Sequence, residues 1–219
     1  MRLRESREIN VVHRSATESR SEPSVRRLSI IIDLLYGFAI GNGLSDAIKG
    51  VVLNFDELSL ALLFLGIVMA FTEWLAYHVH VSHIQYRGIT RLLMDMAFPI
   101  MIYLILLAPS LASHVWNAAY IGSVLLVYFV GALIYVRVLK RESPDHTPNF
   151  AKVGVVCTIL SAGAASLGWA AVALGRNAAS AQNASWTAVS ADLLAMAAIG
   201  LWALFTIRCL RETMDPPEQ

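Results

Sequence analysis

Five acidic residues lie inside otherwise apolar stretches of the sequence, and their side chains are the first candidates for chemistry. They are Asp33, Asp46, Glu73, Asp95 and Asp192. A charged group near the centre of a bilayer costs about 2.5–3.5 kcal/mol on insertion scales, so each such residue needs a structural or functional reason. Carboxylates in this setting either hold helices together through polar contacts or bind protons and cations.

These carboxylates are predicted to occupy two depths. At about 1.5 Å of helix rise per residue, Asp33, Glu73 and Asp95 lie about 8, 10 and 6 Å from the cytoplasmic surface, on three different helices. Asp46 and Asp192 form a second tier near the outer surface. The sequence therefore predicts a cluster of acids in the cytoplasmic third of the bundle.

Basic groups border the cytoplasmic tier and can compensate its charge. They are Arg26, Arg27, Arg91, His78, His80 and His83. One interpretation is a polar clasp that fixes the packing of the first three helices. The other is a site that responds to protons or cations. The two interpretations are compatible, and both stay open.

The same region invites a metal interpretation, which we reject. Glu73, His80 and His83 fall on roughly one helical face and are residue types that ligate metals. However, the chain has only six histidines, and the other three are scattered, too few for clustered histidine boxes. HExxH, GxSxG and phosphate-binding glycine motifs are also missing from the sequence. We therefore predict no enzyme, no metal, no cofactor and no nucleic-acid partner.

The elements that position these residues are predicted to be membrane-spanning helices. Of 219 residues, 57% are hydrophobic and 15% are charged, against about 25% charged in soluble domains. Six apolar stretches approach the ~20 residues that cross ~30 Å of hydrocarbon, where backbone amides must bond within a helix. The predicted spans are residues 28–48, 58–80, 91–112, 115–137, 152–174 and 187–208. The fold class is an all-α, polytopic integral membrane protein with six transmembrane helices.

The Lys and Arg residues predict the orientation. Of 17 in total, all but Lys49 and Arg176 fall on one side of a six-span arrangement. The positive-inside rule then places both termini in the cytoplasm, and we expect a bacterial inner membrane. The chain divides into a basic tail at 1–27, a transmembrane domain at 28–212 and a short tail at 213–219.

The first span has two different faces at 100° per residue. One face combines Asp33 with Gly37 and Gly41, a small-xxx-small pair that lets a neighbouring helix approach closely. The other face is lined by Phe38, Asn42, Ser45 and Asp46, running from apolar to polar toward the outer surface. This second face is suited either to a pore lining or to ordinary contacts with another helix.

Three features resemble the endosomal/lysosomal potassium channels and their six-helix bacterial relatives. RLSIIIDLLYGFAI, residues 27–40, is similar to their first-helix signature, with the Arg27-to-Asp33 spacing and an apolar run. EWLAYH is similar to their second-helix Trp…His element, at Trp74 and His78, and Pro109 falls near a proline that ends helix three. The low-temperature-requirement A membrane proteins have a similar first helix with an Asp, so they are a competing family.

The resemblance implies a homo-oligomeric, potassium-like channel in the lipid bilayer, with monovalent cations as its ligands. First helices of several subunits would line the pore, and the apolar residue five positions after the Asp, here Phe38, would form the constriction. Asn42 and Asp46 would draw cations to the outer mouth. Arg27, Asp33, Trp74 and His78 would form the polar network that holds the helix.

Two other functions fit the same residues. A proton-coupled transporter would bind its coupling ion at Asp33, Glu73 and Asp95 inside one subunit. A non-conducting scaffold or membrane sensor would use the basic tail to recruit partners.

Overall fold

The computed structural model describes residues 29–50, 57–81, 89–110, 113–142, 150–177 and 180–214. Within these ranges the chain is helical apart from short turns and contains no strand. Six of its helices are long and apolar enough to cross a membrane. The predicted all-α class with six such helices is therefore confirmed, while the tail at 1–27, including Arg27, lies outside the described residues.

The helices begin and end close to the predicted spans. The first helix covers Ser29–Gly50, and α2 to α6 cover Glu57–Ala76, Ile89–Leu107, His114–Glu142, Ala151–Gly175 and Ala181–Met214. The largest differences are at α4 and α6, which continue beyond the predicted limits. Hydropathy marks only the part of a helix inside hydrocarbon, whereas the backbone hydrogen bonds continue through the polar ends.

Two helices end in irregular helical turns. Pro109 lies in a 3₁₀ turn, Ala108–Ser110, that ends α3, as predicted. A π-helical turn, Tyr77–Val81, extends α2. α3 also carries a buried proline in its interior, Pro99, one turn after Asp95. Proline has no amide hydrogen, so α3 loses one helical hydrogen bond next to a buried carboxylate.

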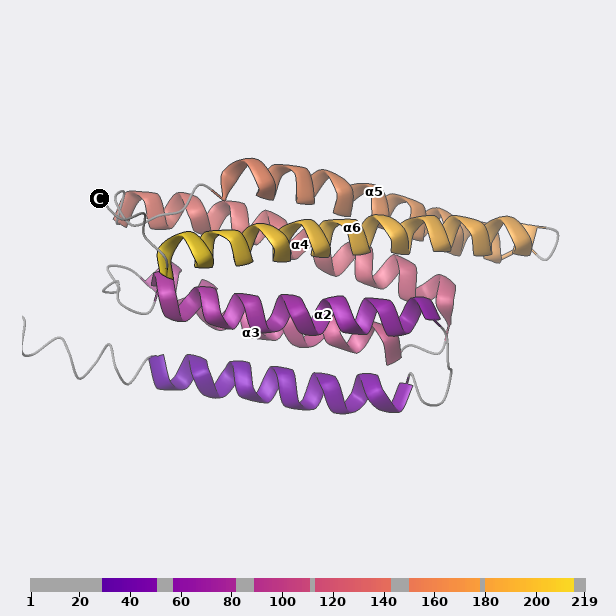
Figure 1. Cartoon of the computed structure of the whole chain (residues 1–219). Coiled ribbons are helices and arrows are strands. Elements are labelled where there is room, and N and C mark those ends of the chain that lie inside the picture. Colours follow the sequence, from indigo (N-terminus) through magenta and orange to yellow (C-terminus); the bar gives the residue numbers. More distant parts are fainter. Residues whose placement is uncertain are drawn as a thin grey trace, which may run out of the picture.

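The helices α4, α5 and α6 form a closely packed unit. The α4 and α5 helices run antiparallel, because a Cβ at Gly122 would meet the backbone of Ala165 and a Cβ at Gly168 would meet that of Ala119. Small residues at these positions bring the backbones into contact. Figure 1 shows α4, α5 and α6 together on one side of the bundle.

The other helices lie against this unit. The α2 helix packs on α6, and α3 packs on α4. The first helix lies at the edge of the bundle, on the side away from α5 (Figure 1). It runs in the same direction as α3, because Gly43 lies beside Leu106 and Gly50 beside Ser110. The start of the first helix and the end of α6 lie at the same end of the bundle (Figure 1).

Candidate functional site

The first helix leaves three of the four residues of its predicted pore face exposed, while the fourth, Asp46, contacts α3. Phe38 is 65% exposed, and Asn42 and Ser45 are also exposed. The Asn42 side-chain amide donates a hydrogen bond of 3.0 Å to the carbonyl of Phe38 in the same helix. Asn42 and Ser45 therefore lie on a surface that the described residues leave uncovered.

The predicted close approach at Gly37 and Gly41 does not occur within the described chain. Both glycines are exposed, and no described residue comes within 4 Å of an added Cβ at either position. The helix buries Ile32, Tyr36 and Ala39 instead. These larger side chains fill more apolar contact area, so they determine which side of the helix faces the bundle.

Asp33 and His78 join the first helix to the end of α2. His78 Nε2 lies 3.0 Å from Asp33 Oδ1, and both side chains are part-exposed. His78 belongs to the π-helical turn, where its Nδ1 is 3.0 Å from the carbonyl of Trp74. The rings of Trp74 and His78 pack with centroids 4.8 Å apart. Of the four residues predicted to hold the helix, the structure places His78 in contact with both Asp33 and Trp74, and Arg27 lies outside the described residues.

Glu73 contacts α6 rather than this pair. Its carboxylate accepts a hydrogen bond from the indole Nε1 of Trp202. The Trp202 ring in turn packs edge-on against Phe129 of α4. The hydrogen bond between Glu73 and the buried Trp202 therefore connects α2 to the α4–α5–α6 unit.

Asp95 lies in a third position, between α3 and α4. Arg91 and Asp95 are both buried, and Arg91 Nε is 3.8 Å from Asp95 Oδ2. The hydroxyl of Tyr135 donates a hydrogen bond to Asp95 Oδ1. A buried arginine close to a buried carboxylate compensates its charge within the bundle.

The three cytoplasmic-tier acids therefore make separate attachments, each between different helices. Sequence analysis identified the acids but not Trp202 and Tyr135, which lie 129 and 40 residues away from their partners. The sequence carries only a weak signal for Trp202 and Tyr135 as partners of these acids. Apolar helices commonly contain Trp and Tyr, and only the packing shows that a donor faces a carboxylate.

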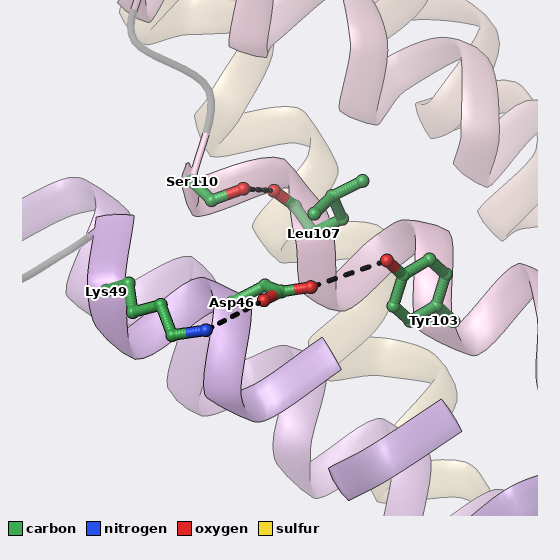
Figure 2. Close-up of polar contacts among 5 residues, drawn as sticks. All are labelled: Asp46, Lys49, Tyr103, Leu107 and Ser110. Atoms are coloured by element: carbon green, nitrogen blue, oxygen red, sulfur yellow. Dashed lines mark hydrogen bonds and ion pairs between the residues drawn. The ribbon is translucent and has the colours of Figure 1, made fainter. Parts of the chain in front are cut away.

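The C-terminal end of the first helix carries a smaller polar group (Figure 2). Asp46 is 3.4 Å from Lys49 Nζ on the same helix. The hydroxyl of Tyr103 on α3 donates to its other carboxylate oxygen at 3.4 Å. Ser110 donates to the carbonyl of Leu107 at 2.6 Å nearby. Asp46 is thus held between two helices and is still part-exposed.

Asp192 belongs to a different part of the molecule from Asp46. It is fully buried on α6, and its Oδ2 lies 3.5 Å from Nδ1 of His114 at the start of α4. The predicted outer tier is therefore two separate sites, one on the first helix and one inside the α4–α5–α6 unit.

Metal ligation is not indicated in the part of the chain that the structure describes. No three His, Cys, Asp or Glu side chains there are grouped to hold an ion. The side chain of His80 and the whole of His83 lie outside the described residues.

The described residues form six helices that are long and apolar enough to cross a membrane, an arrangement typical of the class of multi-pass membrane proteins. Comparisons with family models, curated proteins and solved structures find no match to the chain.

Proposed function

We propose that the chain is one subunit of a homo-oligomeric membrane channel for monovalent cations such as potassium. The observation that carries the proposal is the outward stripe of Phe38, Asn42 and Ser45 on a helix at the edge of the bundle. Hydrocarbon offers no hydrogen-bond partner to the Asn42 side-chain oxygen or to the Ser45 hydroxyl. A water-filled axis shared by several first helices satisfies them.

The order of residues along the stripe supports a hydrophobic gate. Phe38 lies near the middle of the 22-residue first helix, where a ring of phenylalanines narrows a pore and excludes water. Asn42 and Ser45 follow, and Asp46 lies about 12 Å beyond Phe38 at about 1.5 Å per residue. A carboxylate at the mouth raises the local concentration of cations.

The polar attachments hold the gate in position. The contact of Asp33 with His78 fixes the N-terminal half of the first helix against the end of α2. The contact of Asp46 with Tyr103 fixes its C-terminal half against α3. Few other polar groups anchor this peripheral helix in the described chain. A change in either attachment would tilt Phe38 toward or away from the axis.

The charges support an inner-membrane protein with cytoplasmic termini. Exposed basic residues gather at the end of α4, the start of α5 and the end of α6, and they are Arg137, Lys140, Arg141, Lys152, Arg208 and Arg211. The described basic residues at the opposite end are Lys49 and Arg176. The positive-inside rule assigns the basic end to the cytoplasm.

Potassium flux into liposomes tests the gate. Phe38→Ala is expected to raise flux above wild type, because a methyl group leaves a wider and more easily wetted constriction. Phe64→Ala is the matched control, since Phe64 is 64% exposed but lies on α2. Flux that is unchanged in Phe38→Ala, or raised equally in both variants, would remove Phe38 from the gate.

Cysteine cross-linking tests the arrangement independently. In a background without Cys157 and Cys209, Asn42→Cys is expected to form disulfide-linked dimers in the membrane, because the first helices face one another. Phe64→Cys should stay monomeric. If only Phe64→Cys cross-links, the first helix does not face the axis.

One observation favours a proton-coupled transporter as the second candidate. The part-exposed Asp33–His78 pair bridges two helices and offers a site where a proton changes a helix contact. Transport that requires a pH gradient and disappears in Asp33→Asn would select this function. Potassium flux without a pH gradient favours the channel. The absence of flux both with and without a pH gradient favours the scaffold or sensor.

A further inference from the structure

Asp192 is a buried carboxylate that the proposed channel does not use. It is the only charged residue on α6 between residues 181 and 207. Its side chain is 0% exposed. Alanines surround it, because Ala188 and Ala191 of α6 pack against Ala118 of α4 and Ala171 of α5. An ionised carboxylate in such apolar surroundings requires a compensating positive charge.

The neighbouring polar groups come from α4. His114 Nδ1 lies 3.5 Å from Asp192 Oδ2, and the His114 side chain is 31% exposed. One turn further along α4, Asn117 is buried, and its side-chain oxygen has no hydrogen-bond partner among the residues that the structure describes. The site thus reaches from the surface, through the imidazole, to an enclosed carboxylate.

The other charged residues of the helices that pack on α6 lie near the helix ends. On α4 the next charged residue after His114 is Arg137, near the other end. α5 carries no charged residue between Lys152 and Arg176. Arg176 is exposed just beyond α5, where Gly175 lies beside Ala184, two turns of α6 before Asp192.

The remaining helix packed on α6 adds only negative charge. The acidic residues of α2 are Glu57, which is exposed, and Glu73, which binds Trp202, ten residues after Asp192 on α6. Among the residues that the structure describes, His114 is the basic group that lies beside Asp192. The pair is electrically neutral only when it holds one proton, either on the imidazole beside a carboxylate or on the carboxyl group itself.

We propose that His114 and Asp192 form a proton-binding site that takes one proton from the aqueous phase at the outer end of α4. The proton comes from water through the part-exposed imidazole, and no other bond is made or broken. Its release leaves the His114–Asp192 pair with a net negative charge and weakens the contact between α4 and α6. Low pH therefore stabilises this junction, and high pH destabilises it.

Thermal unfolding of the full chain in detergent, at pH values from about 5 to 9 that bracket ordinary histidine titration, tests the site. The wild-type melting temperature is expected to fall by several degrees as the pH rises. Asp192→Asn, which cannot carry a charge, should lose most of that fall. Asp46→Asn is the matched control and should keep it. An Asp192→Asn profile that follows the wild-type profile would overturn the proposal.

A coupled measurement separates proton binding from simple packing. His114→Gln should lower the melting temperature in the wild-type background and have little effect in Asp192→Asn, because the imidazole acts through the carboxylate. Equal effects in the two backgrounds would contradict the pair. If Asp192→Asn does not fold, His114→Gln alone decides, since a pH profile identical to that of wild type excludes the imidazole as the proton carrier.

Discussion

Gly122 of α4 is a position where one added methyl group should strongly destabilise the packing of α4 against α5. A Cβ added there would lie 2.5 Å from the backbone nitrogen of Ala165 and 2.7 Å from the carbonyl carbon of Ala164. Non-bonded contacts between carbon atoms are about 3.5–4.0 Å, so α4 and α5 would have to separate by about 1 Å. The atoms in the way belong to a helix backbone and cannot turn aside as a side chain could.

The expected cost follows from two opposing effects. Overpacking typically costs about 1–3 kcal/mol, and a backbone clash belongs at the upper end. Replacing glycine by alanine in a helix gains about 0.5–1 kcal/mol. Gly122→Ala should therefore lower the free energy of unfolding by about 2 kcal/mol in total, since the clash outweighs the gain in helix propensity.

The same helix provides a control. No described residue comes within 4 Å of a Cβ added at Gly131, so Gly131→Ala should be neutral or stabilising. The two variants are expected to differ by about 3 kcal/mol. A difference of that size corresponds to melting temperatures about 6–12 °C apart for a protein of this size. Thermal unfolding in detergent measures the difference, and equal stability of the two variants would refute the proposed backbone contact between α4 and α5.

Three further substitutions test the polar attachments. Glu73→Ala leaves the Trp202 indole without its acceptor and should cost about 1–3 kcal/mol, whereas Glu73→Gln keeps an acceptor oxygen and should cost less. Chemical unfolding, followed by tryptophan fluorescence, measures the free energy of unfolding of both variants. Equal losses of stability in Glu73→Ala and Glu73→Gln would contradict the hydrogen bond between Glu73 and Trp202. Tyr135→Phe removes the donor to Asp95 and should cost about 1–3 kcal/mol in the same assay; wild-type stability would argue against that contact. His78→Ala should speed amide hydrogen exchange in the first helix and leave α4 unchanged, so equal protection in wild type and variant would mean that the ion pair does not hold the helix.

The number and approximate limits of the helices could be determined from the sequence alone. An apolar stretch of about 20 residues must be helical in hydrocarbon, because every backbone amide has to bond within its own segment. This requirement is local, so it needs no knowledge of neighbours. The break at Pro109 was predictable for the same reason, since proline cannot donate the bond that would continue α3.

The partners of the acids within the apolar helices were decided by tertiary structure. A carboxylate inside a membrane helix signals a polar contact, but its position does not say which helix supplies the partner. The single predicted cluster is therefore resolved into separate contacts of Asp33 with His78, Glu73 with Trp202, and Asp95 with Tyr135. Each contact depends on how whole helices pack.

The rotation of the first helix was also decided only by tertiary packing. In a soluble helix the apolar face marks the buried side, but both the lipid and the protein interior are apolar. The helical wheel could therefore separate Gly37 and Gly41 from Phe38 and Asn42 without showing which set faces the bundle. The contacts of Ile32, Tyr36 and Ala39 with the other helices leave both sets exposed, because the largest apolar contact area lies between them.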